Sequence, residues 1–136
     1  MILADTSVWI QFQRGQLGGP LSEVELLSLV TVPPVIQELF QGLADRPGLD
    51  RFRESVLALP RLADPVPLDM YLEAAEIYRD LRRRGVTVRS SVDCLIAAIA
   101  IANRVAVWHV DRDFDAIAKH TRLSLYARQV RTAGNS

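Results

Sequence analysis

Two short apolar runs, Ile2–Ala4 and Val105–Val110, each end directly before an aspartate, Asp5 and Asp111 respectively. Short runs of this kind are typical of buried strands, and the second is rich in valine, which favours strands. Helical patterns lie between and after them, and a last strand is predicted around Leu123–Tyr126. This alternation predicts an α/β fold in which a parallel sheet has helices on both faces.

The clearest helix is predicted over Asp69–Arg84, where apolar residues recur at helical spacing and Gly85 follows as a stop signal. Another helix is predicted to open at Pro33 and Pro34 and to end near Gly42, because proline suits the first helical turn and glycine the end.

The length of 136 residues fits one domain, 1–136, and the segment 132–136 is predicted to be a frayed tail. The longest apolar stretch, Cys94–Ala102, is far shorter than the roughly 18 to 20 residues of a membrane helix. The N-terminus has no positively charged start of the kind found in secretion signals. We therefore expect a cytoplasmic protein that does not enter a membrane.

Charge is unevenly distributed although the formal net charge is zero. Residues 1–78 hold 5 Lys+Arg against 11 Asp+Glu, formally −6, whereas residues 79–136 hold 11 against 5, formally +6. If a cation neutralised several carboxylates, the remaining surface would be positive and suited to a phosphate backbone. Arg82, Arg83 and Arg89 are the candidates for contacting such a backbone, and an ordinary solvated charged face is the alternative.

Asp93 is the only charged residue in an otherwise apolar helix predicted to open at Ser90 or Ser91 and to continue to Ala102. A helix that is apolar all round is buried, so this carboxylate needs a cation or hydrogen-bond donors nearby. The alternative is a first-turn aspartate stabilised by the helix dipole.

Asp5 and Asp111 are predicted to project from the carboxyl ends of parallel strands, where ligands bind in open sheets. Each of them could instead be a turn-forming aspartate, which is common at strand ends. Glu38 lies within the helix that opens at Pro33, a position where an exposed glutamate is the usual finding.

Four such carboxylates, Asp5, Glu38, Asp93 and Asp111, would together favour Mg²⁺ or Mn²⁺ over zinc, because zinc sites usually contain histidine or cysteine. A cation of this kind supports the hydrolysis of phosphodiester bonds. The neighbouring hydroxyls of Thr6 and Ser7 are predicted either to orient a carboxylate or a phosphate or to cap a helix that starts at Val8.

Two further acids follow Asp111 closely. Asp113 is predicted to have a supporting role behind the metal ligands or to cap the short helix that contains Phe114, and Asp115 is predicted to face solvent.

These residues together resemble a PIN domain over nearly the whole chain. The resemblance rests on the segment Met1–Ser7, on Glu38 after two prolines, and on Asp93 and Asp111 in their sequence contexts, and at this length it points to the VapC toxins. It implies an α/β/α sandwich around a central parallel sheet of about four to five strands. It also implies a Mg²⁺- or Mn²⁺-dependent endoribonuclease whose acidic positions fall on Asp5, Glu38, Asp93 and Asp111.

The resemblance further implies a homodimer and a cognate VapB-type antitoxin, joined in a heterotetramer or a larger complex, in which the antitoxin presents basic groups to the acidic site. One position departs from the family pattern, because many members carry threonine or serine where this chain has His109. We expect His109 to be packed or hydrogen-bonded at a strand end.

Two other functions remain open at this point. The same fold could bind RNA or a partner without turnover, which the absence of one carboxylate would indicate, yet all four are present. A phosphoryl-transfer enzyme that uses an aspartyl intermediate would place a second acid two residues after Asp5, where this chain has Ser7.

Overall fold

The computed structural model describes residues 1–128, so the predicted frayed tail, 132–136, lies outside the described residues. Four strands form one parallel sheet in the order β2-β1-β3-β4. Their bounds are β1 Ile2–Ala4, β2 Leu29–Val30, β3 Ala106–Trp108 and β4 Leu125–Tyr126. The register pairs Leu3 with Val107 and Ala4 with Trp108, so β1 and β3 end at the same edge of the sheet.

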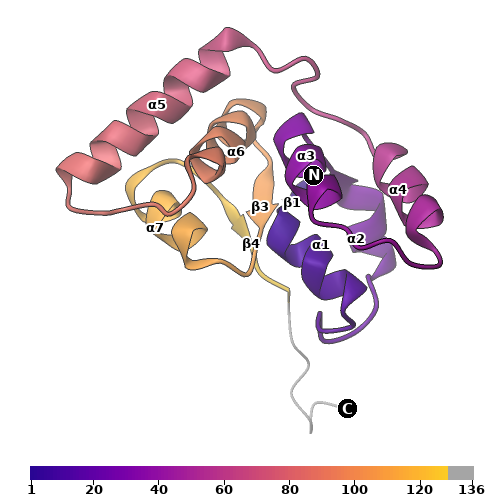
Figure 1. Ribbon diagram of the computed structural model, residues 1–136. Helices are drawn as coiled ribbons and strands as arrows, with labels where there is room; N and C mark the ends of the chain where they lie inside the picture. Colours follow the sequence, from indigo (N-terminus) through magenta and orange to yellow (C-terminus); the bar gives the residue numbers. More distant parts are fainter. Residues whose placement is uncertain (129–136) are drawn as a thin grey trace, which may run out of the picture.

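Seven helices accompany these strands within the described residues. In Figure 1 the strands run through the middle of the molecule, with α5, α6 and α7 on the left and α1 to α4 on the right of this view. The bounds are α1 Thr6–Gln13, α2 Glu23–Ser28, α3 Pro33–Gln41, α4 Leu49–Leu57, α5 Leu68–Arg83, α6 Ser91–Asn103 and α7 Arg112–His120. The α/β fold with a parallel four-stranded sheet confirms the fold predicted from the sequence.

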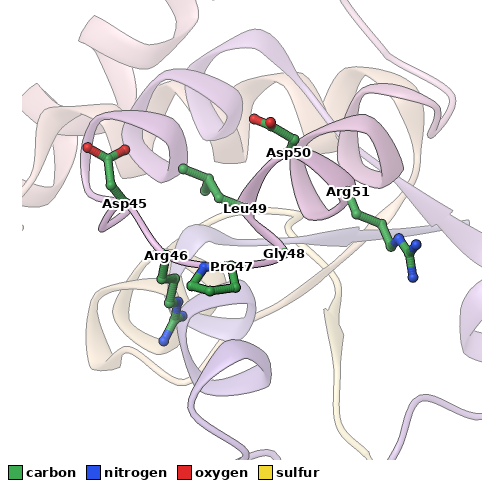
Figure 2. A pocket seen from close by; sticks show the side chains of 7 residues that line it. All are labelled: Asp45, Arg46, Pro47, Gly48, Leu49, Asp50 and Arg51. Carbon is green, nitrogen blue, oxygen red and sulfur yellow. The ribbon is translucent and has the colours of Figure 1, made fainter.

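The chain enters α4 through a tight turn. Gly48 precedes the helix with a φ of 88°, in the left-handed region that favours glycine. Figure 2 shows the pocket formed by this turn, whose lining runs from Asp45 to Arg51. The lining contains none of the predicted metal ligands, so this pocket is separate from the candidate site described below.

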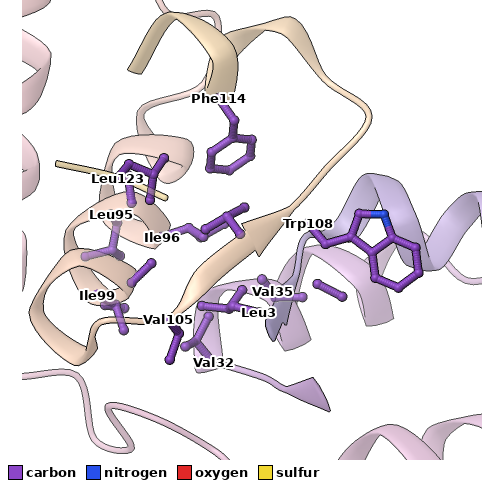
Figure 3. Packing of buried hydrophobic residues seen from close by; sticks show 14 of the residues in the cluster. Leu3, Val32, Val35, Leu95, Ile96, Ile99, Val105, Trp108, Phe114 and Leu123 are labelled. Carbon is purple, nitrogen blue, oxygen red and sulfur yellow. The ribbon is translucent and has the colours of Figure 1, made fainter. Parts of the chain in front are cut away.

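The hydrophobic core lies between the sheet and its helices. Helix α6 is buried along most of its length, and Ile96, Ala97 and Ile99 have no exposed surface. In Figure 3, Ile96 extends from α6 toward β3, and Phe114 of α7 lies above it. Because β1 and β3 are buried in this core, the residues that follow them are held firmly at the sheet edge.

Several helices begin or end where the sequence predicted. Two prolines open α3, and Gly42 follows its last residue. Gly85, with a φ of 76°, follows the end of α5 and supplies the predicted stop. Ser90 precedes α6, but its side chain makes no capping hydrogen bond. None of the helices within residues 1–128 combines the length and the apolar character needed to span a bilayer.

Two helix starts differ from the prediction. The first helix begins at Thr6 rather than Val8, because Asp5 caps it by accepting a hydrogen bond from the Ser7 backbone N–H. Asp111, not Asp113, caps α7 in the same way. Asp5 directly follows β1 and Asp111 follows β3 after His109 and Val110, and in both cases this aspartate is the residue immediately before the helix, where its side chain can accept from a backbone N–H of the first turn.

Candidate metal centre

The predicted acids come from four elements and meet at one edge of the sheet. Asp5 directly follows β1, Glu38 lies on α3, and Asp93 lies in the first turn of α6. Carboxylate oxygens of these three residues, which we call the first set, all lie within 4.8 Å of one another. This spacing is close enough for one divalent cation to bind all three.

A second group of carboxylates lies beside the first. Oxygens of Asp93, Asp111 and Asp113, the second set, also fall within 4.8 Å of one another. Asp93 belongs to both sets, so the structure joins all four predicted ligands through this one side chain and adds Asp113. The sequence pattern placed Asp113 in a supporting or capping role, whereas its geometry is that of a member of the second set.

Neutral donors hold the first set in place. The Ser7 hydroxyl donates a hydrogen bond of 2.7 Å to Oδ2 of Asp5, and the Ser7 backbone N–H donates one of 3.2 Å to the same atom. The Thr6 hydroxyl donates a hydrogen bond of 3.2 Å to Oε1 of Glu38. Thr6 and Ser7 therefore both contact carboxylates of the first set, and Asp5 rather than either of them caps α1.

Asp111 is held by its neighbours along the chain. Its Oδ1 accepts a hydrogen bond of 3.1 Å from the Asp113 backbone N–H, and its own backbone N–H donates one of 3.0 Å to Nδ1 of His109. Nε2 of His109 lies 3.3 Å from Oδ1 of Asp115, and the imidazole packs against Phe114. His109 is thus both packed and hydrogen-bonded, and Asp115 is exposed.

Arg89 reaches the second set from the loop between α5 and α6. Its Nη2 lies 3.2 Å from Oδ1 of Asp111, and its Nε lies 3.8 Å from Oδ1 of Asp113. Its backbone N–H also donates a hydrogen bond of 3.1 Å to Oδ2 of Asp113. The other two candidate arginines, Arg82 and Arg83, are exposed in the last turn of α5, where Arg82 packs over the Tyr78 ring.

The electrostatics of the centre favour a cation. Burial raises the pKa of Asp93 to about 8, and the neighbouring carboxylates of Asp5, Asp111, Glu38 and Asp113 add to the shift. Burial also raises the pKa of Asp5 above its usual range, despite the hydrogen bonds from Ser7. The pKa of Glu38 rises because of burial and the nearby Asp5. A bound cation would relieve this repulsion and restore the charged forms.

The two sets offer oxygen donors only. Both contain carboxylates alone, and histidine and cysteine, the usual zinc ligands, are absent from both. Oxygen ligands of this kind are those that hard divalent cations prefer.

The sequence did not predict one buried charged residue. Glu25 of α2 is 2% exposed and receives hydrogen bonds from Arg128, from the Tyr126 hydroxyl and from the Ser22 backbone N–H. Burial alone would raise the pKa of Glu25, but these contacts outweigh it and lower the pKa to about 2. The only sequence signal is the pattern Ser22-x-x-Glu25, which predicts a helix start rather than a buried ion pair.

Fold and site together define a class, namely parallel α/β proteins that gather carboxylates for a divalent cation at the carboxyl edge of the sheet. The chain belongs to the PIN domain family, which matches residues 2–120.

Relatives of known name support this membership. Ribonuclease VapC11 from Mycobacterium tuberculosis (strain ATCC 25618 / H37Rv) is 38% identical over 131 residues, which cover 90% of this chain and 96% of the relative. Among solved structures, VapBC-5 from Mycobacterium tuberculosis is 26% identical with a TM-score of 0.61, covering 90% of this chain and 94% of that one. FitAcB from Neisseria gonorrhoeae, 20% identical, shares the fold with a TM-score of 0.68, covering 93% of this chain and 97% of that one.

Proposed function

We propose that this chain is the toxin of a toxin–antitoxin pair and acts as a metal-dependent endoribonuclease. The observation that carries the proposal is the convergence of Asp5, Glu38 and Asp93, distant in sequence, to within 4.8 Å in a chain that is 38% identical to ribonuclease VapC11. A binding module without turnover has no need to bury three mutually repelling carboxylates together.

The first set would hold the principal Mg²⁺ or Mn²⁺, and Asp111 would complete the site from the other side of Asp93. When bound, such a cation lowers the pKa of a coordinated water and offsets the charge that develops on a phosphodiester. The chain's own residues orient the ligands: Ser7 fixes the Asp5 carboxylate, and Thr6 fixes that of Glu38. Rigid ligands preserve this geometry when RNA binds.

Arg82, Arg83 and Arg89 are proposed to position the RNA. Arg89 already lies at the acidic centre, so it is placed for a phosphate close to the cleaved bond, whereas the exposed Arg82 and Arg83 are available to phosphates farther along the strand. Replacing all three by glutamine should weaken RNA binding and reduce its dependence on salt, because fewer counterions are then released. An unchanged salt slope would contradict this role.

The partner is proposed to be a VapB-type antitoxin, in keeping with the VapBC complexes among the structural neighbours. A groove lined by Glu38, Tyr71 and Leu95 connects the acidic centre with α5, where Leu68, Tyr71 and Leu72 are exposed. Exposed apolar side chains beside a functional site are suited to a protein partner. Co-purification with the product of the neighbouring reading frame tests this, and Tyr71→Ser with Leu72→Ser should weaken the complex.

The chain is further proposed to act in the cytoplasm as a homodimer that forms a heterotetramer or a larger complex with its antitoxin. Exposed apolar side chains on α2, Val24 and Leu27, offer a surface for a second copy. Light scattering of the purified chain, alone and with the antitoxin, measures both assemblies.

The cleavage proposal is tested with Asp5→Asn and Asp93→Asn. Each should reduce cleavage of RNA in Mg²⁺ or Mn²⁺ by about a hundredfold or more, because the ligand set loses a charge. Asp69→Asn, at an exposed aspartate in α5, is the matched control and should cleave like the wild type. Undiminished cleavage by a folded Asp5→Asn, Asp93→Asn double variant, or equal cleavage in EDTA, would reject the proposal. Mapping the cleavage ends on total RNA would then identify the substrate.

A further inference from the structure

We infer that Arg89 serves as a built-in cation for the second set, so that the centre binds one divalent cation tightly instead of two. The inference rests on the proposed function, because it concerns the same metal centre. It assigns Arg89 a role in the resting protein, before any RNA is bound.

Arg89 holds the second set through both its main chain and its side chain. The guanidinium lies 3.2 Å from Asp111 and 3.8 Å from Asp113, and the backbone N–H binds Asp113 at 3.1 Å. The backbone contact fixes the position of the residue, so its charged group stays next to two carboxylates of the set. A guanidinium in this position satisfies oxygens that a divalent cation would otherwise bind.

The first set has no such neighbour. Within residues 1–128, no lysine, arginine or histidine nitrogen forms an ion pair with Asp5, Glu38 or Asp93. Its donors are the neutral hydroxyls of Thr6 and Ser7 and the backbone N–H of Ser7. Neutral donors orient the oxygens without cancelling their charge, so the first set retains its attraction for a divalent cation.

The two halves of the centre therefore differ in charge although both are built of three carboxylates. In the second set a divalent cation would have to displace the guanidinium or lie beside it, and either arrangement is opposed by repulsion between like charges. A cation in the first set meets no positive group. The first set is therefore the high-affinity site for the divalent cation, whereas the guanidinium of Arg89 neutralises the second set.

Substitution of Arg89 separates its charge from its packing. Its side chain is 66% exposed, so a shorter uncharged residue leaves no cavity in the core. Arg89→Gln removes the charge, and Arg89→Lys keeps it. Arg79→Gln is the matched control, because Arg79 is an exposed arginine that pairs with Glu76 and contacts neither carboxylate set.

The test is calorimetric titration of the metal-free chain with Mn²⁺, with no RNA present. The wild type, Arg89→Lys and Arg79→Gln should each bind one equivalent tightly. Arg89→Gln should bind a second equivalent at least about tenfold more tightly than the wild type does, since the repulsive charge is gone. Adding Asp113→Asn to Arg89→Gln should abolish this gain and so place the new site in the second set.

The other possible results of the titration contradict either the inference or the proposed function. A wild type that binds two equivalents tightly, or an Arg89→Gln variant that binds as the wild type does, overturns the inference. An equal gain in Arg79→Gln overturns it as well, because the effect would then be one of net charge. A wild type that binds no Mn²⁺ contradicts the proposed function instead.

Discussion

The Thr6 hydroxyl donates a hydrogen bond of 3.2 Å to Oε1 of Glu38 and thereby joins the first turn of α1 to α3 across 32 residues of sequence. This contact explains how a glutamate within a helix becomes part of a site built at strand ends. Glu38 is half-buried and near Asp5, and the neutral hydroxyl fixes its carboxylate without neutralising it.

Thr6→Val should therefore weaken Mn²⁺ binding. A hydrogen bond to a charged group is worth about 1.5–3 kcal/mol, which corresponds to a loss of about tenfold or more in affinity. Valine has nearly the same shape as threonine, so the change removes the hydroxyl alone. Titration calorimetry measures the affinity, and Thr6→Ser, which keeps the hydroxyl, should bind like the wild type. Equal affinity for Thr6→Val and the wild type would show that Glu38 does not depend on Thr6.

The metal-free protein should lose stability as the pH rises. The pKa of Asp93 in the folded protein is about 8, above its ordinary value of 3.8, so folding favours the protonated form. The stabilisation from this group is complete below the ordinary value and disappears as the pH rises through about 8. Urea unfolding in EDTA between pH 5 and pH 9, a range of about four units chosen around this pKa, measures the effect.

Asp93→Asn removes the titrating group and should flatten this pH dependence. At the alkaline end the metal-free variant should be more stable than the wild type by several kcal/mol, while it no longer gains stability from Mn²⁺. Asp69→Asn controls for the loss of one negative charge elsewhere. A variant as sensitive to pH as the wild type would mean that burial of Asp93 does not destabilise the charged form.

The sequence predicted the parts of the fold that local patterns encode. The apolar helix around Asp93, the prolines that open α3 and the two strands that end at aspartates are all visible in the residue pattern, and each has its counterpart in the structure. Strand β2, Leu29–Val30, was missed, because two residues give no periodicity and it directly follows a helix.

The sequence did not predict the contacts between residues that are distant along the chain. The pairing of Asp113 with Asp111 and Asp93 depends on how the start of α7 approaches the start of α6, and no local pattern encodes that approach. The same holds for Arg89, which the charge pattern suggested only as a surface group for RNA. The family resemblance supplied the four acids, but physical reasoning on Glu38 alone favoured an exposed side chain.

The contact between His109 and Asp111 gives a further prediction. The imidazole accepts a hydrogen bond from the Asp111 backbone N–H, and Asp111 caps α7. His109→Phe keeps a ring in this buried position but loses the acceptor, so it should destabilise the fold by about 1 kcal/mol and reduce RNA cleavage. His109→Asn offers an acceptor to the N–H two residues ahead, as asparagine does in turns. This variant should therefore retain more of the stability and more of the RNA cleavage.

Urea unfolding and cleavage rates of the two His109 variants, measured side by side, provide the comparison. If His109→Phe and His109→Asn change the stability and the cleavage rate equally, the hydrogen bond at Nδ1 has no role in holding Asp111.

The ion pair between Glu25 and Arg128 should matter for stability and not for the metal centre. Arg128 binds Glu25 at 2.9 Å, donates to the carbonyl groups of Leu17, Gly19 and Pro20, and stacks over the Trp108 ring. These contacts attach the end of β4 to the segment before α2. Arg128→Met leaves the buried carboxylate with Tyr126 and Ser22 only, and breaking a buried pair in this way costs about 3–5 kcal/mol.

A double-mutant cycle with Glu25→Gln separates the pair from its surroundings. The double variant should be less destabilised than the sum of the single variants, because no unpaired charge remains.

The pKa of Glu25, about 2, lies below its ordinary value of 4.5, so its contribution to stability is present above 4.5 and is lost as the pH falls through about 2. The cost of Arg128→Met in urea unfolding should accordingly be larger at neutral pH than in acid. Mn²⁺ affinity should stay at the wild-type value in every variant of the cycle, and additive single effects would show that the two residues do not act as a pair.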